Sequence, residues 1–367
     1  MPGRHNNNDL EIVSCNACYG QGGLGAALAE LVETARARGE LAGYFSSQSK
    51  AGDPLGHDIP LSQWRGVFRV PPLRYRHAWR DFLSGELFDR AVASRLTPCD
   101  RLIGFNGRAL HTFRRARALG CRELVLESGT PHIEHVWRRH AEAHARYPFD
   151  QTWVCSATRR KYILEYETAD IILYQSDYTR KSLIDAGIPE HKLQRRTQPV
   201  APRFAPPAYW PQNGPLVVVC VGRLQVSKGI PVLIDAFKQI PDPSAELILI
   251  GGAATDGMER YLKGCVATDP RIKIRPGDPI PHLHRADVLV HPSFEDGLAL
   301  APLEALACGI PVIVTEDTGM KESVIEGVNG FIVPRGNVVA LVEKINEVRR
   351  NPLRGSFPTI HSSAITR

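Results

Sequence analysis

Short apolar runs alternate with helix-like segments almost from one end of this 367-residue chain to the other. Continuous Val, Ile and Leu strands set between helices are typical of parallel sheets covered on both faces. The predicted strands lie at 11–15, 41–46, 66–70, 101–105, 123–128, 170–175, 215–222, 245–252, 271–277, 287–293, 311–316 and 330–334. Helical patterns lie at 24–38, 107–120, 132–147, 229–240, 257–268, 300–309 and 337–350. The pattern predicts an α/β protein with two doubly wound parallel sheets.

A proline-rich seam separates the two sets of strands. Residues 199–215 contain six prolines and show neither helical nor strand periodicity. Since proline lacks the N–H group that helices and sheets need, this stretch is predicted to be a stiff extended connection. We predict one domain at 1–205, a second at 206–350 and a short tail at 351–367. Ligands of such sheets bind beyond the carboxyl ends of the strands, so two facing domains predict an active site in the cleft between them.

The hydropathy pattern and the distribution of charge narrow the class of protein. No apolar run approaches the roughly 18 residues of a membrane span, and the first residues lack the apolar core of a secretory signal, so we expect a cytoplasmic protein. Residues 101–203 contain 18 Lys and Arg against 11 Asp and Glu, a surplus of 7. This basic part is either an ordinary solvated face or a surface for phosphates or for the inner face of a membrane. No nucleic-acid-binding motif accompanies it, so no nucleic-acid partner is predicted.

A glycine turn follows the first predicted strand. Gly20, Gly22 and Gly25 have the G-x-G-x-x-G spacing by which many folds bind a dinucleotide. A nicotinamide site also needs an acidic residue at the end of the second strand, where this chain has Ser47 and Gln48. We therefore treat a nicotinamide oxidoreductase as the weaker alternative and expect a turn that faces a phosphate. The C-x-x-C pair Cys15 and Cys18 lacks a second pair, so no metal site is predicted.

Two loops of the second half contain the residues best suited to binding a ligand. Arg223 follows a predicted strand, and Lys228 precedes a glycine that opens a helix, an arrangement suited to a diphosphate. Glu295 and Asp296 follow another buried strand, and Glu304 lies in the helix after them. Carboxylates accept hydrogen bonds from sugar hydroxyls. The alternatives are surface cations, a solvated acidic turn and a helix-capping acid.

Four motifs in order, GRL…SKG, ELILIGG, HPSFEDGLALAPLEALACGIPVIVTEDTG and EGVNGFIVPRGN, resemble the donor-binding half of the retaining glycosyltransferases of family 4. The resemblance covers most of residues 214–350. The first half is similar more loosely, through its glycine turn, ESGTPHIE, ADIILYQSDYTRKSL and RFAP. The resemblance implies the GT-B fold, in which two Rossmann-like domains face each other across a cleft. It also implies a nucleotide-diphosphate sugar as co-substrate, without a further cofactor.

The resemblance implies roles for matching residues. Arg223 and Lys228 would bind the donor diphosphate, and Glu304 the nucleotide ribose. The acid that contacts the donor sugar falls on Asp296 by spacing, whereas Glu295 is the expected residue type one position early. The remaining matches are the backbone of Gly297, Leu298, Ala299 and Leu300 for phosphate or sugar, Gly22 and Gly23 for the donor phosphates and acceptor, and His132 near the donor sugar. His132 is equally compatible with a place at the start of a helix.

The implied reaction is the metal-independent transfer of a hexose with retention of configuration. The chain has no D-x-D, the metal-binding motif of the other major glycosyltransferase architecture. Retention would arise by front-face attack of the acceptor hydroxyl, with Asp296 as an alternative covalent nucleophile. We expect a glycan or lipid-linked acceptor, as in polysaccharide or lipopolysaccharide biosynthesis. A nucleotide-sugar epimerase of the same architecture is the other alternative.

Overall fold

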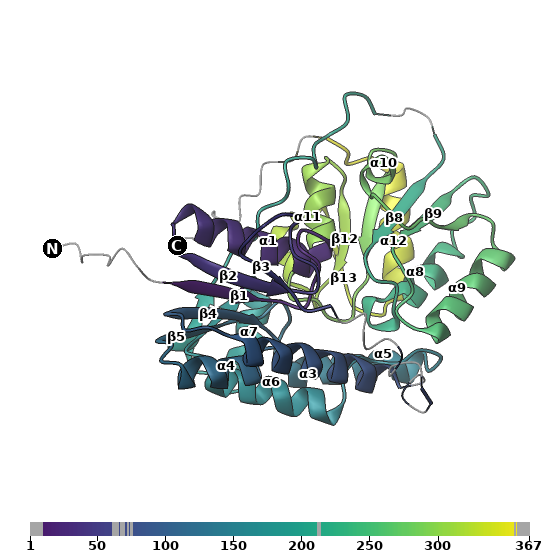
Figure 1. Cartoon of the computed structure of the whole chain (residues 1–367). Coiled ribbons are helices and arrows are strands. Elements are labelled where there is room, and N and C mark those ends of the chain that lie inside the picture. Colours follow the sequence, from purple (N-terminus) through teal and green to yellow (C-terminus); the bar gives the residue numbers. More distant parts are fainter. Residues whose placement is uncertain are drawn as a thin grey trace. The chain divides into compact units, whose positions relative to one another are not determined.

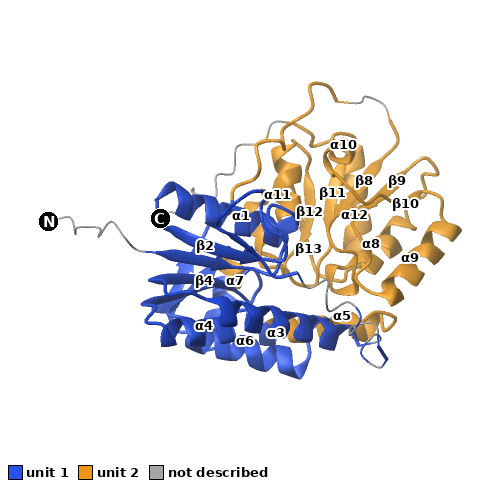
Figure 2. Cartoon of the chain, in the orientation of Figure 1, with its two compact units in different colours: residues 1–134, 153–175, 180–198 blue, residues 135–152, 176–179, 199–367 orange. Residues whose placement is uncertain are grey.

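The computed structural model describes residues 10–60, 66, 70–71, 73, 76–210, 214–355 and 357. The chain divides into two compact units (Figure 2). Unit 1 consists of residues 1–134, 153–175 and 180–198, and unit 2 of residues 135–152, 176–179 and 199–367. The predicted domain limits stay a prediction, and the strand predicted at 66–70 lies largely outside the described residues. Among the described helices, none is both long and apolar enough to cross a membrane.

Unit 1 is built on a parallel sheet with the strand order β3-β2-β1-β4-β5-β6-β7. Its strands are β1 (Glu11–Ser14), β2 (Leu41–Ser46), β3 (Gly56–Asp58), β4 (Arg101–Phe105), β5 (Glu123–Glu127), β6 (Ile171–Tyr174) and β7 (Leu193–Arg195). Its helices are α1 (Gly22–Ala37), α3 (His77–Arg95), α4 (Leu110–Ala118), α6 (Ser156–Thr168) and most of α7 (Asp177–Asp185). Helix α1 covers one face of the sheet, and α3, α4 and α6 lie on the other (Figure 1).

Unit 2 is built on a second parallel sheet, with the strand order β10-β9-β8-β11-β12-β13. Its strands are β8 (Val217–Val221), β9 (Glu246–Ile250), β10 (Ile272–Ile274), β11 (Val288–His291), β12 (Val312–Thr315) and β13 (Gly330–Val333). Its helices are α8 (Ile230–Phe237), α9 (Asp256–Thr268), α10 (Ile280–Leu283), α11 (Leu300–Ala307) and α12 (Val338–Arg350). Helix α5 (Ile133–Arg146) belongs to this unit from residue 135 onward.

The alternation of side chains along each strand of unit 2 explains its continuous apolar runs. In β8, Val218 and Cys220 belong to one cluster of buried apolar side chains, whereas Val217 and Val219 belong to another. Successive residues of a strand point to opposite faces of the sheet. Both faces of this sheet are therefore buried under helices, which confirms the predicted doubly wound architecture of the second half.

A glycine brings two loops of unit 2 into contact. Gly229, between η4 (Val226–Lys228) and α8, has a φ of +70°, a conformation that other residues adopt only under strain. A Cβ atom at this position would lie 1.9 Å from the carbonyl oxygen of Pro292. The loop after β8 thus packs directly on the segment after β11 because residue 229 has no side chain.

This close approach predicts opposite effects for two glycine-to-alanine substitutions. Gly229→Ala is expected to lower the free energy of unfolding by at least about 2 kcal/mol, from left-handed strain together with the collision at Pro292. Gly264→Ala, inside α9, meets no atom within 4 Å and is expected to raise it by about 0.5–1 kcal/mol. Chemical denaturation of both variants measures the two changes; a Gly229→Ala protein as stable as the wild type would contradict the packing described.

Candidate functional site

The loops after β8 and β11 place an ammonium group against two acidic residues. These strands are neighbours in the sheet, so their carboxyl ends lie at the same edge. The Nζ atom of Lys228 lies 2.7 Å from Oδ2 of Asp296 and 3.3 Å from the backbone oxygen of Glu295. Oδ2 of Asp296 also lies 3.0 Å from Nε2 of His291. The structure therefore brings together three of the residues predicted from sequence, Lys228, Glu295 and Asp296.

The electrostatics of this cluster favour the charged forms. Burial alone would raise the pKa of Asp296, but the Lys228 charge and the His291 hydrogen bond outweigh burial and lower it. The pKa of Glu295 is lowered in the same way, against burial, by Lys228 and His140. For Lys228, burial would lower the pKa, and the two carboxylates raise it instead. The site thus contains two carboxylates around one ammonium group.

Helix α5 contributes a histidine that the sequence analysis did not identify. Nε2 of His140 lies 3.1 Å from Oε1 of Glu295, and both side chains are buried. The pair is separated by 155 positions along the chain. The only sequence signal was the position of His140 in the predicted helix at 132–147, which does not reveal its partner.

The other predicted residues of the second half lie in the same unit. Arg223 follows β8 and is exposed. Gly297 lies between β11 and α11, and its carbonyl accepts a hydrogen bond from the Ser176 hydroxyl at 2.5 Å. Leu298 and Ala299 lead into α11, which begins at Leu300, and the first N–H groups of a helix have no partner inside it. Glu304 is half-buried in α11, and burial raises its pKa. Their contacts with a donor stay a prediction.

In unit 1 the glycine fingerprint shapes the start of α1. Gly20 and Gly22 have φ values of +71° and +63°, and a Cβ atom at Gly25 would lie 2.1 Å from the carbonyl oxygen of Cys18. Gly22 and Gly23 are exposed in the first turn of α1. The spacing therefore forms a tight turn that the first helix approaches closely. That Gly22 and Gly23 face the donor phosphates and the acceptor stays a prediction.

His132 lies directly before α5 and is buried. Its ring Nδ1 accepts a hydrogen bond from the backbone N–H of Glu134 at 3.3 Å. The backbone N–H of His132 donates to the Ser182 hydroxyl at 2.9 Å. Its ring stacks on Tyr166 with 5.0 Å between centroids. His132 therefore lies at the start of a helix, which is one of the two positions that the sequence allowed. A contact of His132 with the donor sugar stays a prediction.

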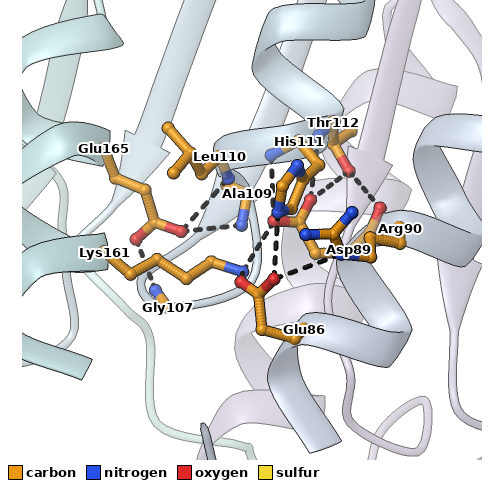
Figure 3. A network of polar contacts seen from close by, with 10 residues as sticks. All are labelled: Glu86, Asp89, Arg90, Gly107, Ala109, Leu110, His111, Thr112, Lys161 and Glu165. Carbon is orange, nitrogen blue, oxygen red and sulfur yellow. Dashed lines mark hydrogen bonds and ion pairs between the residues drawn. The ribbon is translucent and has the colours of Figure 1, made fainter. Parts of the chain in front are cut away.

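One cluster in unit 1 has the composition of a metal site, namely Glu86, Asp89 and His111 (Figure 3). Between the two carboxylates lies Nζ of Lys161, at 2.6 Å from Glu86 and 2.7 Å from Asp89. The same Asp89 carboxylate accepts hydrogen bonds from the backbone N–H groups of His111 and Thr112. The geometry fits an internal ammonium ion that joins α6 to α3 and α4, because Asp89 already has its partners and Lys161 supplies the positive charge.

The Lys161 network predicts a large effect on stability. Lys161 and Asp89 are 4% and 0% exposed, so Lys161→Met leaves a buried carboxylate without its cation. We expect the free energy of unfolding to fall by roughly 3–5 kcal/mol in denaturant titrations. Lys181→Met is the matched control, since this lysine is 76% exposed in its pair with Asp185, and we expect it to change stability by less than about 0.5 kcal/mol. Equal, small changes in both variants would be incompatible with a buried ion pair at Lys161.

The lowered pKa of Asp296 predicts a pH-dependent contribution to stability. A carboxyl group whose pKa is lower in the folded state stabilises the fold above its unfolded pKa of about 3.9, and this contribution is lost as the pH falls further. The destabilisation caused by Asp296→Asn should therefore be full above about pH 5. Below about pH 4 it should shrink by up to about 1.4 kcal/mol per pH unit. Denaturant titrations of both proteins from pH 3 to pH 7 measure this difference, and a constant difference would contradict it.

The second half of the chain is similar to a family of glycosyl transferases. Residues 207–358 match the family described as "Glycosyl transferases group 1". The capsular polysaccharide biosynthesis glycosyltransferase CapM of Staphylococcus aureus is 33% identical over 143 residues, which are 37% of this chain and 37% of that protein. The D-inositol 3-phosphate glycosyltransferase of Salinispora tropica is 29% identical over 229 residues, which are 56% of this chain and 47% of that protein. The chain thus spans less than half the length of these curated relatives.

Solved structures with low sequence identity share the fold over nearly the whole chain. Sucrose-phosphate synthase from Thermosynechococcus elongatus has a TM-score of 0.69 at 20% identity and covers 94% of this chain and 90% of its own. HepE of Anabaena in complex with UDP has a TM-score of 0.63 at 19% identity, covering 93% and 90%. WaaG, a glycosyltransferase involved in lipopolysaccharide biosynthesis, has a TM-score of 0.66 at 16% identity, covering 94% and 92%. Residues 207–358 are thus similar to the group 1 glycosyl transferases, and the two Rossmann-like units have the GT-B fold.

Proposed function

We propose that this protein transfers a sugar from a nucleotide-diphosphate sugar to a hydroxyl group of an acceptor. The observation that carries the proposal is the ion-paired Lys228 at the carboxyl ends of β8 and β11, inside the segment that matches the family. A cation suits the diphosphate of such a donor, and the neighbouring acids suit the hydroxyl groups of its sugar. Ligands of parallel α/β sheets bind at this edge of the sheet.

The chemistry that we propose relies on stabilising the leaving group. Negative charge develops on the diphosphate as the bond between the anomeric carbon and the phosphate oxygen breaks, and Lys228, Arg223 and the N-terminus of α11 would stabilise it. The acceptor oxygen forms the new bond on the same face of the sugar, and its proton passes to the departing phosphate oxygen. This route retains the anomeric configuration and needs no metal ion, in keeping with the absence of a D-x-D motif from the sequence.

The choice of substrates follows from similar proteins. HepE was solved with UDP and with UDP-glucose, so UDP-sugars are the first donors to test. CapM is named for capsular polysaccharide biosynthesis and WaaG for lipopolysaccharide biosynthesis. We propose a glycan or lipid-linked acceptor in polysaccharide or lipopolysaccharide assembly. The excess of basic residues at 101–203 supports work in the cytoplasm at the inner face of the membrane.

Calorimetric binding of UDP and GDP tests the diphosphate contacts. Lys228→Ala and Arg223→Ala should each weaken binding of the preferred nucleotide about 10- to 100-fold, because each removes a charge-assisted hydrogen bond. Lys263→Ala is the control, since its exposed lysine pairs with Glu259 in α9 and should leave the affinity within about twofold. Unchanged affinity in both site variants would remove the proposed role of these cations. Transfer and nucleotide release with a panel of nucleotide sugars then test the reaction itself, and the anomeric NMR signal of the product tests retention.

A further inference from the structure

Glu295 and Asp296 are adjacent in sequence but differ in the surroundings of their carboxylate oxygens. Oδ2 of Asp296 faces both Lys228 and His291. Glu295 is 3% exposed, and its Oε1 lies 3.1 Å from Nε2 of His140. In the part of the chain that the structure describes, Oε2 of Glu295 is buried without a hydrogen-bond partner. Buried polar atoms normally have partners, so this oxygen indicates a contact that a ligand completes.

His140 holds the other oxygen of Glu295 in place. Its ring is 1% exposed, with Nε2 3.1 Å from Oε1 of Glu295 and Nδ1 2.7 Å from the hydroxyl oxygen of Thr152. A carboxylate only accepts hydrogen bonds, so Nε2 carries a proton and donates it. Nδ1 forms the second ring hydrogen bond, with the Thr152 hydroxyl, which can act as donor or acceptor. The three side chains form a continuous hydrogen-bonded series, in which His140 donates to Glu295.

Three further side chains in and directly after α5 contact other elements of unit 2. Arg139 lies 3.0 Å from the Asp317 carboxylate, in the loop after β12. The Tyr147 hydroxyl donates to the Asp235 carboxylate of α8 at 2.8 Å. Phe149 stacks on Tyr261 of α9, with 4.3 Å between ring centroids. These contacts fix residues 139–149 on the same unit that contains Glu295, as positioning of a carboxylate requires.

The nature of the missing partner follows from its charge. Oε2 belongs to an ionised carboxylate and needs a hydrogen-bond donor. Phosphate oxygens are negatively charged and repel it, whereas a sugar hydroxyl carries a proton to donate. The nearby Lys228 ammonium already pairs with Asp296. A hydroxyl of the donor sugar therefore fits this oxygen, and the diphosphate does not.

We propose that His140 is a positioning residue, which orients Glu295 so that its Oε2 accepts a hydrogen bond from a hydroxyl of the donor sugar. Asp296 is then the counter-ion of Lys228, although its spacing from Glu304 matches the sugar-binding acid of the family. The inference rests on the proposed function. It separates the two acids into one that binds the sugar and one that holds the cation.

Kinetics with UDP-glucose, or with the nucleotide sugar that the wild type prefers, test the inference. His140→Phe removes both ring hydrogen bonds and should lower kcat/KM about 10- to 100-fold, while the Kd for UDP alone stays within about twofold. His140→Gln, which retains an N–H donor, should recover part of the loss. His144→Phe, one turn further along α5, is the matched control and should stay close to the wild type. Equal losses of UDP affinity and kcat/KM in His140→Phe would indicate a structural role only and overturn the inference.

Deoxy donors identify the contact directly. For the wild type, one of the deoxy analogues of the donor sugar should lower kcat/KM by at least about tenfold. Glu295→Gln should be indifferent to the same deletion, and Asp296→Asn should remain sensitive to it. Glu295 variants that respond to every deletion as the wild type does would contradict the assignment. If the wild type binds no nucleotide and turns over no nucleotide sugar, the proposed function fails.

An NMR measurement tests the positioning independently of activity. Long-range ¹H–¹⁵N correlation of the imidazole ring should show a proton on Nε2 of His140. A ring with its proton on Nδ1 alone would overturn the proposed direction of the hydrogen bonds, whether or not the protein transfers sugar. His140→Phe provides the assignment of the signal, and its unfolding transition establishes that the variant is folded.

Discussion

The ion pair between Lys228 and Asp296 is the interaction on which the candidate site depends. It joins two loops that leave neighbouring parallel strands, and the bare backbone at Gly229 allows those loops to touch. Two ionised acids next to each other repel, and the Lys228 ammonium group, together with His140 and His291, keeps both charged. A diphosphate would add further negative charge to the same cation. Lys228 can bind an added anion only if other groups also form hydrogen bonds with the two carboxylates. His291 contacts Asp296 in this way, and His140 contacts Glu295.

The position of Lys228, Glu295 and Asp296 at one edge of the sheet could be predicted from sequence because it depends on strand ends, whereas the ion pair between Lys228 and Asp296 was not predicted. Ligands bind beyond the carboxyl ends of parallel strands, so the loops after β8 and β11 were predicted to contain the binding residues. The contact between His140 and Glu295 has no such rule behind it. The helix at 132–147 was predicted, but its residues from 135 onward pack on unit 2, which is formed mainly by residues after 198. Periodicity identifies a helix and its apolar face, and it does not identify the sheet on which that face packs.

The strands that the sequence analysis missed are short and at the edge of the first sheet. β3 consists of Gly56, His57 and Asp58, and β7 of Leu193, Gln194 and Arg195. Edge strands are often brief and polar, so neither shows the apolar run that indicates a central strand. Helix α6 was missed for a related reason. Its inward side includes Lys161 and Glu165, whose charges are compensated by partners on α3 and at the start of α4. Such a helix lacks an apolar stripe although it is packed.

Two buried polar clusters in this protein differ in a way that separates a structural role from a functional one. Around Lys161, both oxygens of Glu86, Asp89 and Glu165 have hydrogen-bond or ion-pair partners, as Figure 3 shows. A network completed in this way joins helices rigidly and has no capacity left for a ligand. Around Lys228, Asp296 is paired, but Oε2 of Glu295 is buried without a described partner. An unpaired buried acceptor destabilises the fold, and a ligand that donates a hydrogen bond to Oε2 would remove this cost.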